Sequence, residues 1–250
     1  MMKSIDILAF AAHPDDAEIG CGGSLILAAN QGLRVAVADL SAGEMSSRGH
    51  PTLRAQETAD ATKRLGLCAR YSLALPDGYL GTEPAHRAPI IDLIRQTKPR
   101  IVLAPYYVDR HPDHEATGKL VREACFFAGV HKIGQGEPHR PQHFYYYMIH
   151  HPFPPSFVID ISAVWEQKLA AIMAYASQFQ STNTADEPQT ALSDSRFMRF
   201  LEAKAIWFGA MIGVSYGEPF FSHAPVHLPH LPSLADAPQA TGLPAYKMSL

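Results

Sequence analysis

The stretch that decides the fold is residues 5–16, which read IDILAFAAHPDD. Apart from Asp6, residues 5–12 form a continuous apolar run, which is typical of a strand buried on both faces of a parallel sheet. A polar segment, residues 13–16, follows directly. In an open α/β sheet, ligands bind beyond the carboxyl ends of the strands. The same stretch therefore predicts a central strand and a candidate site at its end.

Strand-like and helix-like segments alternate through the first half of the chain. Further strands are predicted over residues 35–40, 71–75 and 101–104, and helices over residues 22–31, 53–65, 89–96 and 115–127. Helices of this length between strands indicate βαβ units with right-handed crossovers. We therefore expect an α/β fold, with a Rossmann-like, mostly parallel sheet covered by helices on both faces.

The second half of the chain is less regular. Candidate strands are the tyrosine-rich residues 143–149 and residues 157–161, and candidate helices are residues 164–175 and 193–211. Five prolines follow Pro219 and argue against a long helix or a central strand there. We expect one domain over residues 1–220 and a proline-rich C-terminal arm over residues 221–250.

The composition is that of a globular protein, with 47% hydrophobic and 18% charged residues. A net charge of −3 gives no basic face for nucleic acid or an anionic membrane. No apolar run approaches the roughly 20 residues of a membrane-spanning helix. The three cysteines do not suggest a disulfide framework, and no signal-type cleavage site follows the N-terminus. We expect a cytoplasmic protein that acts on a small molecule.

Two clusters of histidine and aspartate follow predicted strands. The first is residues 13–16, HPDD, and the second is residues 109–114, DRHPDH. The first and fourth strands can be neighbours at the point of a doubly wound sheet where the strand order reverses. We therefore expect the two clusters to converge. The alternative interpretation is that these residues only cap helices and form turns, since aspartate is a preferred N-cap.

The clusters contain the ligands of a possible metal site. His13 and Asp16 are three residues apart, so a strand-to-helix turn can bring both side chains to one point. His114, or else His111, would complete a set of two imidazoles and one carboxylate. Three protein ligands with one open position is the arrangement of a catalytic zinc. Iron(II) suits the same ligands.

The remaining polar residues of the clusters suggest hydrolytic chemistry. Asp15 is next to a ligand but points elsewhere, so it is free to act as a general base. His111 would then stabilise an oxyanion and protonate a leaving group, with Asp113 orienting it. A non-haem iron oxygenase also uses two histidines and a carboxylate, but the spare carboxylate and the βαβ scaffold favour hydrolysis.

A glycine-rich stretch offers a competing interpretation as a dinucleotide fingerprint. Residues 20–23 read GCGG, and Asp39 ends the next predicted strand. In a G-x-G-x-x-G/A register that starts at Gly20, however, Leu25 occupies the third glycine position. The glycines also begin some way past the end of the strand. We therefore do not expect a nicotinamide or flavin cofactor.

Over residues 7–219 the chain resembles the LmbE-like (PIG-L) family of zinc-dependent N-acetylglucosaminyl deacetylases. The resemblance rests first on AHPDD at residues 12–16 and on HPDH at residues 111–114. Closer similarity is to the bacillithiol-biosynthesis branch, whose members deacetylate N-acetylglucosaminyl-malate. The stretches that carry it are residues 39–47, 53–57, 73–78 and 213–220.

The resemblance implies a role for each matching residue. The positions that match zinc ligands are His13, Asp16 and His114, the general base matches Asp15, and the transition-state stabiliser and its partner match His111 and Asp113. Arg54 and Arg110 match positions associated with substrate carboxylates, which guanidinium groups bind with two parallel hydrogen bonds. The alternative for each arginine is a surface or intersubunit salt bridge.

Together with the two motifs, the resemblance implies a zinc-dependent hydrolase that removes the acetyl group from an N-acetylglucosaminide, first of all N-acetylglucosaminyl-malate. One alternative is a deacetylase of another N-acetylated amino sugar, or an amidase of a thiol conjugate. An alternative of another class is a non-catalytic sugar-binding protein, which would need no general base. Family members are commonly hexamers, so we also expect a homo-oligomer, with the tyrosine-rich strand and the arm as candidate assembly surfaces.

Overall fold

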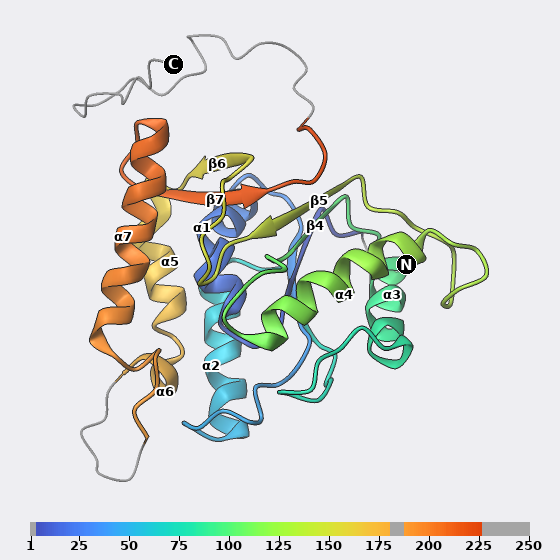
Figure 1. Ribbon diagram of the computed structural model, residues 1–250, viewed down its shortest axis with the longest axis horizontal. Helices are drawn as coiled ribbons and strands as arrows, with labels where there is room; N and C mark the ends of the chain where they lie inside the picture. Colours follow the sequence, from blue (N-terminus) through green and yellow to red (C-terminus); the bar gives the residue numbers. More distant parts are fainter. Residues whose placement is uncertain (1–3, 181–187, 227–250) are drawn as a thin grey trace.

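The computed structural model describes residues 4–180 and 188–226. At its centre is a seven-stranded sheet in the order β3-β2-β1-β4-β5-β7-β6 (Figure 1). The strands are β1 (Ile7–Ala11), β2 (Val35–Asp39), β3 (Ala69–Ser72), β4 (Ile101–Pro105), β5 (His143–Tyr147), β6 (Phe157–Asp160) and β7 (Gly217–Phe221). The pairs from β3 to β5 are parallel, and β7 is antiparallel to both of its neighbours. The predicted α/β class with a mostly parallel sheet is confirmed.

Helices cover both faces of the sheet (Figure 1). On one side lie α1 (Asp16–Asn30), α2 (Pro51–Arg64), α5 (Trp165–Ile172), the short α6 (Ala176–Phe179) and α7 (Ser195–Ile212), and on the other lie α3 (Pro84–Thr97) and α4 (Pro112–Ala128). Side chains of β1 alternate between these layers. Leu8 and Phe10 pack with α3 and α4, whereas Ala9 and Ala11 pack with α1. β1 is therefore buried on both faces, as its apolar run predicts.

Helix α1 begins at Asp16, six residues before the predicted start, so the glycine-rich stretch lies within the helix. A Cβ atom at Gly20 would collide with the ring of Tyr147, and one at Gly23 would lie 2.8 Å from Cγ2 of Ile161. These glycines therefore allow α1 to pack closely against its neighbours. They do not form a phosphate-binding loop between strand and helix, which agrees with the rejection of a dinucleotide fingerprint.

Strand β7 was not predicted, and the expectation that the proline-rich region holds no central strand is wrong at its start. Pro219 lies within β7, which is hydrogen-bonded between β5 and β6. The proline is tolerated because β5 pairs only with Phe220 and Phe221, so at Pro219 the strand is paired on the β6 side alone. Of the expected arm, residues 227–250 lie outside the described residues.

The tyrosine-rich strand is an interior strand. β5 lies between β4 and β7, and the side chains of Tyr146 and Tyr147 are buried. Core packing therefore accounts for these two rings, and a role of the rest of the strand in assembly stays a prediction. Within the described residues, no helix is both long and apolar enough to cross a membrane.

A buried ion pair ties α1 to strand β7 and to helix α5. Glu218 of β7 accepts hydrogen bonds from the N–H groups of Gly23 (2.8 Å) and Ser24 (2.7 Å) in the middle of α1. Nζ of Lys168 in α5 lies 2.6 Å from Oε1 of Glu218 and donates to the carbonyl of Ile19 at 2.9 Å. The pair thus connects α1, α5 and β7, and it helps to position α1, whose first turn carries Asp16.

Replacement of Glu218 should destabilise the fold. Glu218→Gln leaves the Lys168 ammonium buried without its counter-charge, and removing one partner of such a pair costs about 3–5 kcal/mol. The free energy of unfolding is measured by urea titration. The matched control is Asp60→Asn, which breaks the exposed pair with Arg64 and should cost at most about 1 kcal/mol. A loss for Glu218→Gln no larger than that of the control would contradict this role.

Candidate metal centre and active site

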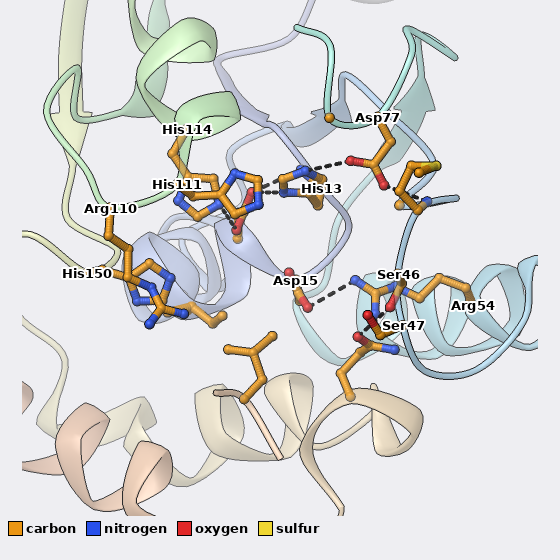
Figure 2. Close-up of a pocket in the computed structure, with 17 residues that line it drawn as sticks. His13, Asp15, Ser46, Ser47, Arg54, Asp77, Arg110, His111, His114 and His150 are labelled. Atoms are coloured by element: carbon orange, nitrogen blue, oxygen red, sulfur yellow. Dashed lines mark hydrogen bonds and ion pairs between the residues drawn. The ribbon is translucent and has the colours of Figure 1, made fainter. Parts of the chain in front are cut away.

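The two histidine–aspartate clusters meet because β1 and β4 are adjacent and parallel. Ile7 pairs with Ile101, and Ala9 pairs with Leu103, so both strands end at the same edge of the sheet. Residues 13–16 leave β1 there, and residues 109–114 leave β4. Figure 2 shows His13, His111 and His114 side by side in one cavity. The predicted convergence is what the structure shows.

Asp16 lies between the two imidazoles that were predicted as ligands. Its Oδ2 is 3.4 Å from Nδ1 of His13, and its Oδ1 is 3.1 Å from Nε2 of His114. Ligands at 2.0–2.1 Å from a tetrahedral zinc are separated by about 3.3 Å. Each contact is thus of about ligand-to-ligand length, but among the described residues the sets of three whose ligand atoms all lie within 4.8 Å of one another do not include Asp16. His111 is also near, since His13, His111 and His114 each offer a nitrogen within 4.8 Å of the others.

The second nitrogen of each predicted ligand imidazole faces a carboxylate. Nδ1 of His114 lies 3.0 Å from Oδ1 of Asp109, and Nε2 of His13 lies 3.0 Å from Oδ1 of Asp77. Histidine ligands of metals commonly donate their other N–H to a carboxylate, which fixes the tautomer and the ring orientation. This arrangement leaves Nε2 of His114 and Nδ1 of His13, the two atoms beside Asp16, as the nitrogens available to a cation.

The charge of the cluster also favours a cation. Although burial alone would lower the pKa of His114, the carboxylates of Asp16 and Asp109 raise it to about 9. Burial would raise the pKa of Asp16, but His114 and His13 hold it well below its usual value. The carboxylates thus hold positive charge on the imidazoles. A divalent metal would replace those protons, because metal ligands bind in their deprotonated form.

Asp15 points away from Asp16 because its backbone is unusual. Its φ of +120° lies in a region that non-glycine residues rarely adopt. Such strain persists mainly where the surrounding structure enforces it, often at functional sites. The Asp15 carboxylate lies 3.0 Å from Nη2 of Arg54 (Figure 2). Burial raises the pKa of Asp15 to about 7, against the opposing effect of the Arg54 cation. A carboxylate with a pKa near neutrality suits general base catalysis.

His111 is held by a backbone group and not by the Asp113 carboxylate. The N–H of Asp113 donates to Nδ1 of His111 at 3.2 Å, which leaves the proton of a neutral ring on Nε2. Burial and the cations of His114 and His13 lower the pKa of His111. The Asp113 carboxylate instead accepts from the N–H of Gly78 (2.7 Å) and lies 3.4 Å from Nε2 of His13. The contact of Asp113 with His111 is therefore made by its backbone, and an orienting role of its side chain stays a prediction.

Both predicted substrate-binding arginines line the same cavity, of about 290 Å³. Arg54 of α2 is buried, and its Nη2 donates to the Pro14 carbonyl as well as to Asp15. Among the described residues, Nε and Nη1 of Arg54 have no hydrogen-bond partner. Buried N–H groups without partners are costly, so these two donors indicate a missing acceptor. Arg110 is exposed at the opposite side of the cavity (Figure 2).

Sequence reasoning assigned no role in the site to two carboxylates and one histidine that the structure places there. Asp77 belongs to a Pro-Asp-Gly turn, which the sequence indicates only as a turn. Asp109 stands two residues before His111, and that proximity was its only signal. His150 follows β5, and its ring is stacked on that of His114 with centroids 5.5 Å apart. Only the fold brings its segment to the end of β4.

Comparison with known proteins identifies the family. The PIG-L family model, described as GlcNAc-PI de-N-acetylase, matches residues 8–125. Diacetylchitobiose deacetylase of Thermococcus kodakarensis is 30% identical over 229 residues, which cover 85% of this chain and 80% of that protein. The chain belongs to the PIG-L (LmbE-like) deacetylase family.

Two further matches extend over most of this PIG-L family chain. A probable N-acetyl-alpha-D-glucosaminyl L-malate deacetylase 2 of Bacillus cereus is 25% identical, with 80% of this chain and 96% of that protein covered. The crystal structure of a conserved protein of Thermus thermophilus superimposes with a TM-score of 0.83 at 39% identity, and covers 92% of this chain and 100% of that one. The protein is accordingly an enzyme, a deacetylase of the LmbE-like family.

Loss of the Asp109 carboxylate should weaken metal binding. In Asp109→Ala no side-chain oxygen remains to accept from Nδ1 of His114, so His114 loses the partner that fixes its tautomer. Changing such a partner of a metal ligand typically costs about 10–100-fold in metal affinity. The measurement is Zn²⁺ competition against a chromophoric chelator, with the exposed Glu166→Gln as control. Equal affinities of the two variants would exclude this role for Asp109.

Proposed function

We propose that the protein hydrolyses the acetamide of an N-acetylglucosaminide whose aglycone carries a carboxylate, with N-acetylglucosaminyl-malate of bacillithiol biosynthesis as the expected substrate. One observation supports this most directly. Asp15 lies in a single cavity between the candidate metal ligands and the unpartnered N–H groups of Arg54. A base, an electrophile site and an anion site are thus arranged along one small pocket.

Three residues would hold the metal, namely His13, Asp16 and His114. The geometry around Asp16 supports this set, because both imidazoles offer it a nitrogen while their far nitrogens face carboxylates. When bound, zinc or iron(II) would polarise the acetamide carbonyl and lower the pKa of a water molecule. His111 is then left to contact the substrate.

Asp15 would act as the general base. Its carboxylate takes a proton from the attacking water as the new C–O bond to the acetyl carbon forms. The same carboxyl group returns that proton to the amine nitrogen as the C–N bond breaks, which releases acetate and a free glucosamine amine. Nε2–H of His111 donates a hydrogen bond to the oxyanion, because Nδ1 is already occupied by the backbone N–H of Asp113.

Arg54 would bind the carboxylate of the aglycone. A guanidinium group forms a two-point fork through Nε and Nη2 or through Nη1 and Nη2, because the Nε–H bond points to the Nη2 side. In Arg54, Nη2 is used by Pro14 and Asp15, so Nε and Nη1, which have no hydrogen-bond partner among the described residues, can each donate a single hydrogen bond to a carboxylate. The similarity to the Bacillus cereus malate deacetylase supports an anionic aglycone. Arg110, on the other side of the cavity, is the second candidate for such a contact.

A neutral disaccharide is the second candidate substrate. The diacetylchitobiose deacetylase of Thermococcus kodakarensis has a higher identity to this chain than the Bacillus cereus protein has, and its named substrate has no carboxylate. The same base and metal ligands would serve both reactions. The two substrates therefore differ in whether their aglycone offers a carboxylate for Arg54 and Arg110 to bind.

Substitution of Asp15 should remove the chemistry and leave the metal. Asp15→Asn keeps the shape of the side chain but cannot accept a proton from water, so acetate release should fall by about 10²–10⁴-fold. Acetate is measured by a coupled assay on metal-loaded protein, and bound metal is measured in parallel by elemental analysis. A variant with near-normal turnover, at equal metal content, would disprove the assignment of the base.

Substitution of Arg54 should change the choice of substrate. Hydrogen bonds to charged groups contribute about 1.5–3 kcal/mol, so Arg54→Ala should lower the preference for the malate conjugate over diacetylchitobiose by roughly 10–100-fold. The measurement is the ratio of kcat/KM for the two substrates. Because Arg54 also contacts Asp15, the ratio is needed to cancel the shared effect on the base. The exposed Arg64→Ala is the control, and an unchanged ratio in Arg54→Ala would contradict the anion site.

A further inference from the structure

The outer face of α7 carries a continuous apolar stripe. Figure 1 shows α7 at one edge of the molecule, on the outside of α5. Its inner side chains, Phe197, Leu201 and Phe208, are buried, whereas Trp207 on the outer side is 67% exposed. Other large apolar side chains exposed along α7 are Phe200, Ile206, Met211 and Ile212. Contiguous exposed apolar patches of this kind mark interaction sites.

The spacing within the stripe indicates that its partner is a helix. Phe200, Ala203, Trp207 and Ala210 are all exposed and follow one another at intervals of three, four and three residues. This is the a/d heptad pattern of a helix that packs along another helix in a coiled-coil seam. A loop or an extended peptide does not require that period.

The side-chain sizes indicate that the partner is a second copy of the same helix. Each large residue of the seam has a small one at the same distance on the other side of Ala205. In an antiparallel pair with a two-fold axis at Ala205, Trp207 lies opposite the partner's Ala203. Phe200 lies opposite the partner's Ala210. Each large ring thus meets a methyl group, as close packing requires, and the face is self-complementary, as a two-fold interface must be.

Charge supports the same antiparallel orientation. The first half of α7 carries Arg196 and Arg199, and the last turn has no basic residue. The C-terminal end of a helix carries partial negative charge, which nearby cations stabilise. In the antiparallel pair, Arg199 lies opposite the partner's Met211, next to that uncompensated end. A parallel pair would place the arginines of both helices together.

We propose that α7 packs antiparallel against α7 of a second copy of this chain, with a two-fold axis at Ala205. The contact does not depend on the proposed substrate or on the metal. It assigns the assembly surface to an amphipathic helix near the C-terminal part of the domain.

The test uses the full chain in solution. Sedimentation velocity should give the wild type a mass that is an even multiple of one chain, and Trp207→Glu should halve that mass. Tyr79→Glu changes another exposed aromatic residue and should leave the mass unchanged. Trp207 is one of two tryptophans, and the other, Trp165, is buried. Emission should therefore shift to longer wavelength as dilution exposes Trp207.

A size exchange tests the register of the pair. Ala203→Trp alone places two large rings opposite each other and should weaken association by at least tenfold in the dissociation constant. The double variant Ala203→Trp, Trp207→Ala exchanges the large and small residues about the axis, so each large ring again meets a methyl group. This variant should restore association. The same mass in wild type and Trp207→Glu would overturn the proposal, as would failure of the exchange to restore association. A monomeric wild type would also overturn the proposal, whether the emission wavelength indicates that Trp207 is exposed to solvent or that its own chain covers it.

Discussion

The parallel pairing of β1 with β4 is the constraint on which the active site depends. The chain supplies one cluster of histidine and aspartate near its start and another about a hundred residues later. Neither cluster alone surrounds a cation. The register that places Ile7 beside Ile101 brings both strand ends to one edge. The contact of Asp16 with His114, which joins the two clusters, follows from that single adjacency.

Buried ion pairs hold helix α1 in place beside this edge of the sheet. Arg70 contacts both Asp39 and Glu18, and Lys168 contacts Glu218, so the first turn of α1 and its middle are each held by an ion pair. Such pairs add little net stability compared with apolar packing, but breaking one is costly. They fix the helix in one position. The deacetylase chemistry therefore rests on a helix that cannot shift without leaving a charge unpaired.

The sheet and the position of the cavity are predictable from the sequence, because both depend on local sequence patterns. The apolar run before His13 and the alternation of strands and helices give the sheet, and two motifs at strand ends give the cavity. What the sequence does not reveal depends on contacts between distant segments. β7 was missed because the five prolines that follow Pro219 argue against a central strand, although none of them lies within Gly217–Phe221. Asp109 belongs to the second cluster but received no role, because only the fold shows that its carboxylate contacts both His114 and the backbone of His150.

The left-handed backbone at Asp15 has an evolutionary consequence. Strained residues of this kind cost about 1–3 kcal/mol, and glycine adopts the same conformation without that penalty. A mutation to glycine at this position would thus remove the proposed general base and at the same time relieve the backbone strain. A descendant with glycine at position 15 would lose hydrolysis and gain stability. Selection for turnover, and not for stability, therefore keeps an aspartate at a position whose backbone conformation favours glycine.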